Sequence, residues 1–265
     1  MKLKIAYSTC PNDTFIFGAL AQGLIDTKGI TFEPYLYDLQ ELNQLARKVE
    51  FDVIKVSAAA YLLLKQYYTL LQTGGAVGRG CGPLLVAKKK IEYEDIPLAN
   101  IAIPAIDSTA HLLLNYFCPY IRSKPVMTFN EIIPAILDNQ VDAGVIIHES
   151  RFVYQEKGLV LIQDLGENWE NITGLPIPLG VILASNKIPQ TQIPIINQLI
   201  YKSIQYAYSH PEEIFPYIQK HSQELEVEVI AAHINLYVNE FSLNLGKEGN
   251  KALDKMEEVA QRHLL

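Results

Sequence analysis

Cysteine is scarce in this sequence, which has three residues of this type, Cys10, Cys81 and Cys118, in a chain of 265. An odd number of cysteines cannot pair completely into disulfides, and the spacing of these three matches no metal-binding motif. Reduced thiols are typical of cytoplasmic proteins. We therefore expect a cytoplasmic protein and predict no metal site from its cysteines.

The sequence also lacks an excess of positive charge and a long apolar run. Its 22 Lys and Arg residues face 29 Asp and Glu residues, which gives a formal net charge of −7. Such a chain has no broad basic surface for nucleic acid or anionic lipid. The apolar runs are too short to span a bilayer, and residues 1–7 lead into a predicted strand without the features of a signal peptide. We expect neither nucleic-acid binding nor membrane insertion.

Apolar residues are plentiful, at 49% of the chain, and support a sizeable core. A chain of this length is expected to form two compact lobes. Two short apolar segments, 83–87 and 179–184, are predicted to be strands at which the chain crosses between the lobes. Residues 1–86 and 180–265 then form one lobe and residues 88–178 the other, with a ligand cleft between them.

The C-terminal third has the apolar spacing of helices, over residues 190–209, 227–238 and 247–264, with a further helix starting at Pro211. Four histidines fall in or between these helices and are expected to face solvent or to cap helix ends: His210, His221, His233 and His263.

The most informative stretch is residues 141–151, where an apolar run ends abruptly in polar residues. Ala143 to Ile147 is typical of a buried parallel strand, and His148 and Glu149 follow it directly, before a predicted helix. Ligands of open α/β sheets bind at the carboxyl ends of strands, and an imidazole there can act as an acid or a base. A capping or structural role for His148 is the alternative.

Three other predicted strands end in the same way, with small polar or ionisable residues at the start of a helix. If these ends face one crevice, they form a binding site built largely of helix N-termini. The four strand ends are Ser8 to Thr14, Lys55 to Ser57, Asp107 to Thr109, and His148 to Ser150.

Each candidate in these segments also has a structural interpretation. Asp13 has the position of a helix cap, and Ser57 and Thr109 can cap helices as well as bind a ligand. Lys55 lies on an apolar strand, where a buried ammonium group requires a partner.

The glycine-rich segment 73–83 matches neither a dinucleotide-binding fingerprint nor a phosphate-binding P-loop, which argues against nucleotide binding. Arg79 is the single cation within it. It is a candidate clamp for a carboxylate, with a solvated surface arginine as the alternative.

Motifs along nearly the whole chain resemble the 1,4-dihydroxy-6-naphthoate synthase family of the futalosine route to menaquinone. Each motif is short, but their order along the chain makes the set specific. They are Pro11 to Phe17, Lys55 to Ser57, Gly74 to Gly80, Gly82-Pro83, Ser108 to Ala110, Gly144 to Phe152, Thr173 to Gly180, and Tyr237 to Ser242.

The resemblance implies an α/β, two-lobed fold like that of the type II periplasmic binding proteins, with two hinge crossings and a helical C-terminal part. It also implies a carbon–carbon lyase that converts cyclic dehypoxanthinyl futalosine, a small carboxylate, to 1,4-dihydroxy-6-naphthoate without a metal or organic cofactor. Aromatisation of the product supplies driving force, and the protein supplies proton abstraction and orientation.

By position, the resemblance makes His148 the catalytic base. The family usually has two threonines where this chain has Ser108 and Thr109, and Val56 replaces a more familiar leucine. The implied substrate-binding residues are Lys55, Val56, Ser57, Thr109 and Ala110. Supporting roles are implied for Asp13, Ser108, Arg79 and Tyr154.

Two other functions stay open from the sequence. One is a related enzyme on the same fold, such as a chorismate dehydratase. The other is a non-catalytic intracellular binding protein that closes over a small carboxylate. The oligomeric state is also open, with a homodimer as one option.

Overall fold

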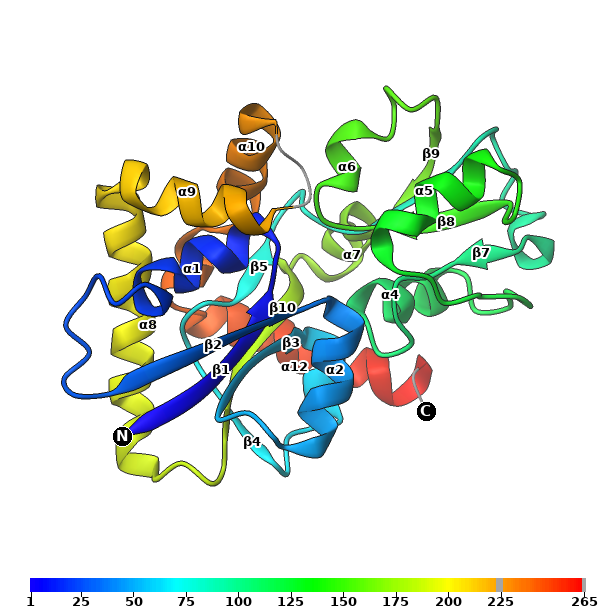
Figure 1. Ribbon diagram of the computed structural model, residues 1–265. Helices are drawn as coiled ribbons and strands as arrows, with labels where there is room; N and C mark the ends of the chain where they lie inside the picture. The colour runs from blue at the N-terminus through cyan, green and yellow to red at the C-terminus, as the bar shows by residue number, and fades with distance from the viewer. Residues whose placement is uncertain (223–225, 264–265) are drawn as a thin grey trace.

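The strands of the protein form two separate sheets in the computed structural model, which describes residues 1–222 and 226–263 (Figure 1). In the first sheet the strand order is β2-β1-β3-β10-β4, and β5 also pairs with β10. Its strands are β1 (Lys2–Ser8), β2 (Thr31–Tyr37), β3 (Val53–Ser57), β4 (Tyr68–Leu70), β5 (Ala76–Gly78) and β10 (Ile177–Ser185).

The second sheet has the order β7-β8-β6-β9. Strand β8 runs parallel to β7 and antiparallel to β6, so this sheet is mixed. Its strands are β6 (Leu84–Ala87), β7 (Ile101–Ala102), β8 (Ala143–Ile146) and β9 (Val160–Asp164).

Strands β1, β2 and β3 are parallel and alternate with helices, as the predicted strand–turn–helix units require. Carboxyl ends of parallel strands meet at one edge of a sheet. Ser8 and Ser57, the last residues of β1 and β3, therefore lie at the same edge, from which the following helices begin.

Helices α1, α8, α9 and α10 share one apolar cluster beside the first sheet, whereas α2, α3 and α12 contribute to another. The cluster that contains α2, α3 and α12 also includes residues of both sheets and of α4. Apolar packing therefore joins the two sheets. The helices associated with the first sheet are α1 (Pro11–Ala21), α2 (Leu39–Lys48), α3 (Ala58–Leu62), α8 (Ile193–Ser209), α9 (Pro211–His221), α10 (Val227–Tyr237), α11 (Glu240–Leu243) and α12 (Gly246–His263).

The second sheet carries a smaller set of helices (Figure 1). Helix α5 packs closely on β8, where Ile132 lies so near Gly144 that a Cβ atom on this glycine would be 2.3 Å away. These helices are α4 (Thr109–Phe117), α5 (Phe129–Leu137), α6 (Ser150–Val153) and α7 (Leu165–Thr173). Short 3-10 turns occur at Ile96–Leu98 and Gln190–Gln192.

The starts of helices α1, α2 and α4 are stabilised by residues typical of helix N-termini. Helix α2 begins with a capping box, in which Asp38 and Glu41 satisfy each other's backbone N–H groups. Helix α4 is capped by the Ser108 hydroxyl, which accepts a hydrogen bond from the His111 N–H. Pro11 occupies the first position of α1, where a missing N–H costs nothing.

The chain passes from the first sheet to the second between β5 and β6 and returns between β9 and β10. The two sheets confirm the predicted α/β class. Residues 84–87 all belong to the second sheet. The chain therefore passes to this sheet a few residues before the predicted lobe boundary at 86–88. The division into two lobes stays a prediction, and residues 223–225 and 264–265 of its first lobe lie outside the described residues.

Within residues 1–222 and 226–263, no helix combines the length and hydropathy needed to cross a membrane.

Gly82 and Gly166 touch through their backbones where the chain enters β6 and α7. A Cβ atom on Gly82 would lie 2.3 Å from the Gly166 Cα atom, and neither backbone can move away easily. We expect Gly82→Ala to lower the free energy of unfolding by about 2–3 kcal/mol, measured by urea denaturation.

Gly23→Ala is the control for this substitution, because Gly23 has a left-handed backbone but open space around it. Its cost should stay near 1 kcal/mol, which reflects backbone strain alone. Equal losses for the two variants would contradict the proposed backbone contact.

Candidate active site

A cavity of about 70 Å³ lies at the helix starts and is lined by residues of both sheets and of the helices that follow their strands. The sequence-predicted residues that line it are Asp13, Lys55, Val56, Ser57, Ser108, Thr109, Ala110 and His148. The predicted convergence of four strand ends on one crevice is therefore present in the structure.

His148 sits in a turn directly after β8 with a strained backbone, because its φ is 55°. This left-handed conformation is uncommon for residues other than glycine and is often found at functional sites. The Nε2 atom of its ring is buried and has no hydrogen-bond partner among the described residues. Buried polar atoms are almost always paired, so an unpaired one in a cavity wall indicates a place for a ligand.

Desolvation determines the charge of His148. It lowers the pKa of the imidazole to about 4, and the nearby Asp13 carboxylate opposes this effect while the Lys55 ammonium adds to it. An imidazole with this pKa is neutral at physiological pH. The ring therefore has a free lone pair, and the lowered pKa also makes it a weaker base than an exposed imidazole.

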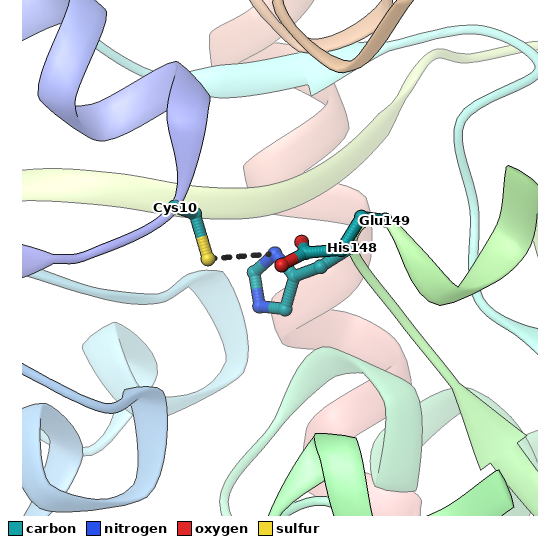
Figure 2. Close-up of side chains that lie close together, drawn as sticks. All are labelled: Cys10, His148 and Glu149. Carbon is teal, nitrogen blue, oxygen red and sulfur yellow. Dashed lines mark hydrogen bonds between the residues drawn. The ribbon is translucent and has the colours of Figure 1, made fainter. Parts of the chain in front are cut away.

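Cys10 meets His148 across the two halves of the chain, as Figure 2 shows. Its Sγ atom lies 3.5 Å from the imidazole Nδ1 atom. Burial raises the pKa of the thiol well above its ordinary value, and the nearby Glu149 acts in the same direction. Cys10 therefore remains a neutral thiol, which disfavours a role as a nucleophile.

Among the described residues, one group of ligand atoms lies close enough together to be considered for a metal: those of Cys10, His148 and Glu149, all within 4.8 Å of one another. Zinc bonds of about 2.0–2.3 Å place tetrahedral ligands roughly 3.5 Å apart. The value of 4.8 Å is an upper limit, and the 3.5 Å between Cys10 Sγ and His148 Nδ1 matches this edge, so the predicted lack of a metal stays a prediction.

Lys55 and Asp13 form a buried ion pair with an Nζ–Oδ1 distance of 2.7 Å. Lys55 also donates to the Gly74 carbonyl oxygen. The Asp13 carboxylate accepts further hydrogen bonds from Ser8 and from the Asn12 side chain. Asp13 lies in the first turn of α1, and the N-cap residue of this helix is Cys10. Asp13 therefore pairs with Lys55 and is not the helix cap.

Ser57 is held by Asn43, which is fully buried on α2. The Ser57 N–H donates to the Asn43 side-chain oxygen, and the Asn43 amide donates to the Ser57 hydroxyl and to Asp107. Arg47 completes the network with an ion pair to Asp107 at 3.0 Å. The network connects α2 and the end of β3 to the loop before α4.

Thr109 bridges the two halves of the chain. Its hydroxyl donates to the Leu179 carbonyl oxygen and accepts from the Ala59 N–H, both at 3.3 Å. The hydroxyl is therefore engaged in the protein itself. The first residues of α4, Thr109 and Ala110, still bring the positive end of the helix dipole to the cavity.

Arg79 and Tyr154 do not line this cavity. Arg79 pairs with Glu248 at 2.8 Å and donates to the Gly174 carbonyl oxygen. Tyr154 is buried in the apolar cluster around β6 and β8. Their predicted supporting roles stay predictions.

The structure corrects the prediction for His233, which is fully buried rather than facing solvent. Its Nε2 atom lies 3.0 Å from the Asn12 side-chain oxygen, and its Nδ1 atom lies 3.6 Å from Glu149 Oε2. His210 precedes α9 and His221 is half-buried at its end. The side chain of His263 lies outside the described residues.

Asn12 and Tyr237 also line the cavity, and Cys10 and His233 lie beside His148, although the sequence did not single out these four residues. Cys10 and Asn12 fall inside the Ser8 to Thr14 segment, which was predicted to reach the crevice. Tyr237 and His233 come from α10, and nothing local in their sequence points to the cavity.

Two α/β sheets with a cavity lined by strand ends and helix starts define the fold of the periplasmic binding proteins. A Candida albicans protein described as having the generic periplasmic binding protein fold superposes with a TM-score of 0.70 at 16% identity, covering 98% of this chain and 90% of that one. A crystal structure of an Archaeoglobus fulgidus protein superposes with a TM-score of 0.93 at 33% identity, covering 98% and 97%.

The chain belongs to the menaquinone biosynthesis family, whose model matches residues 3–262. A Thermus thermophilus relative named 1,4-dihydroxy-6-naphthoate synthase is 41% identical over 254 residues, which are 96% of this chain and 92% of the relative. The resemblance found in the sequence motifs and the expected fold are thereby confirmed.

Breaking the Lys55–Asp13 pair should be costly, because each single substitution leaves a buried charge without its partner. We expect Asp13→Asn or Lys55→Met alone to lower the free energy of unfolding by about 3–5 kcal/mol, and the double variant to lose much less than the sum. Urea denaturation of the four proteins measures this coupling.

The exposed pair Lys90–Glu92 is the control, and its coupling should stay below about 1 kcal/mol. Additive losses at Asp13 and Lys55 would show that the buried pair is not the stabilising contact.

Proposed function

We propose that this chain is a lyase that converts cyclic dehypoxanthinyl futalosine to 1,4-dihydroxy-6-naphthoate, with His148 as the proton acceptor. The observation that carries the proposal is the buried, unpartnered Nε2 atom of His148 in the cavity wall. The name of the Thermus thermophilus relative supports the product, and the sequence motifs support the substrate.

His148 has the protonation state that a base requires. The Nε2 lone pair accepts the proton, while Nδ1 keeps its hydrogen and donates it to Cys10 Sγ. The imidazolium formed in this step is favoured by the Asp13 carboxylate, which raises the pKa of His148. Proton abstraction by a positioned side chain typically contributes about 10²–10⁴-fold to a rate.

The substrate carboxylate has its best surroundings at the starts of α3 and α4. Ser57 directly precedes α3, and Thr109 and Ala110 open α4, so backbone N–H groups and helix dipoles favour an anion there. An ammonium group has three N–H donors, and Asp13 and Gly74 engage two of those on Lys55. The third can donate to the substrate, whereas Arg79 is paired elsewhere.

The cavity contributes orientation and the exclusion of water. Val56 and Ala110 are buried apolar residues in its wall. Enclosure of the substrate between the two halves fixes the proton to be removed near His148. The aromatic product supplies the driving force. The cytoplasmic location and the homodimer remain predictions.

The direct test incubates the purified protein, in chelator-treated buffer, with cyclic dehypoxanthinyl futalosine and follows the product by absorbance and mass. His148→Asn should lower kcat by about 10²–10⁴-fold while KM changes little, because the substrate is bound by other groups. His221→Gln, on the surface of α9, is the control and should keep full activity.

An unchanged kcat for His148→Asn would remove the base assignment. Turnover of chorismate in place of the futalosine derivative would identify the related dehydratase instead. Binding without any product would identify a binding protein.

The pH dependence of kcat/KM provides a second test. Because the neutral imidazole is the active form, the rate should rise with pH through the pKa of about 4 and stay flat above about pH 5. Half-maximal activity near pH 6.5 would instead indicate an imidazole with its ordinary pKa.

A further inference from the structure

His233 is a fully buried histidine beside the site that the proposed chemistry leaves without a role. It lies on α10 with no exposed surface. One side of its ring faces Asn12, whose amide N–H donates to Asp13 Oδ1 at 3.0 Å. This bond fixes the orientation of the Asn12 amide, so its oxygen faces His233. The hydrogen of the imidazole must therefore be on Nε2, which donates to Asn12 Oδ1 at 3.0 Å.

The other side of the His233 ring faces the turn that carries the proposed base. Its Nδ1 atom lies 3.6 Å from Oε2 of Glu149, which is buried and directly follows His148. The contact is longer than a hydrogen bond, and a proton on either atom would make it attractive. The His233 ring is also stacked parallel to the His148 ring, with 6.1 Å between centroids and 9° between planes.

These contacts connect the two halves of the molecule at the site. Asn12 and His233 belong to α1 and α10, which pack beside the first sheet, while His148 and Glu149 follow β8 of the second sheet. A strained backbone persists where its surroundings determine it strongly. The left-handed φ of His148 requires such a constraint on the turn.

We propose that His233 is a positioning residue for His148: it links Glu149 to Asn12 and so fixes the turn that presents the His148 ring to the cavity. The proposal rests on the proposed function, in which His148 accepts the proton. His233 acts through Glu149 and the neighbouring ring, without touching the substrate.

Two amide substitutions separate the two contacts of His233. In His233→Gln the side-chain amide reaches the Nε2 position and keeps a donor for Asn12, but nothing remains opposite Glu149. In His233→Asn the amide lies at the Nδ1 position and keeps a partner for Glu149, while the contact to Asn12 is lost. Both replacements are neutral and smaller than or similar in size to histidine.

We expect His233→Gln to lower kcat by about 10–100-fold with KM within about threefold, because a small misplacement of a base slows the chemical step more than binding. His233→Asn should keep most of the rate. Glu149→Gln offers an N–H to Nδ1 and should also keep most of it, whereas Glu149→Ala should behave like His233→Gln. His221→Gln is the matched control on the surface of α9.

A readout independent of turnover separates this proposal from the proposed function. In protein with isotope-labelled histidine, NMR signals of the His148 ring should shift more in His233→Gln than in His233→Asn, because both lose the stacked ring but only the first loses the partner of Glu149, and they should stay in place in His221→Gln. This result supports the positioning role even if the wild-type protein makes no product from cyclic dehypoxanthinyl futalosine.

Unchanged His148 signals and unchanged kcat in folded His233→Gln would overturn the proposal. Equal losses of kcat in His233→Gln and His233→Asn would also overturn it, since a merely structural histidine does not distinguish its two neighbours. Circular dichroism establishes that each variant is folded.

Discussion

The Asp13 carboxylate is the charge on which the organisation of the site depends. It accepts hydrogen bonds from the end of β1, from Asn12 and from Lys55 on β3, so one buried group fixes the relative positions of three segments. Burying a carboxylate is tolerable because its acceptors are satisfied by a cation and by polar hydrogens. From it, hydrogen bonds continue through Asn12 to His233, whose Nδ1 atom lies 3.6 Å from Glu149 in the turn of His148.

The same enclosure that requires this pairing also determines the chemistry. Desolvation lowers the pKa of the His148 imidazole and so favours its neutral form, and its Nε2 atom has no hydrogen-bond partner among the described residues. The helix starts at Ser57 and Thr109 also line this cavity, and their dipoles favour an anion there. In the proposed function, the base, the anion site and the apolar wall thus come from strands that end at one place.

Much of this arrangement was predictable from sequence, because a strand followed by polar residues and a helix has a recognisable local pattern. The pattern located Ser57, Thr109 and His148, and the cost of burying an ammonium indicated a partner for Lys55. The contact of His233 with Asn12 joins residues 221 positions apart, so no local pattern reveals it. The ion pairs that hold Arg79 away from the cavity depend likewise on α7 and α12.

The central claim is that enclosure keeps His148 neutral and able to accept a proton. An NMR titration of the labelled histidine rings in the ligand-free protein tests it most directly, with His148→Asn used to assign the signal. The account predicts a pKa of about 4 for His148. A value near 6.5, the ordinary value for an exposed imidazole, would contradict it.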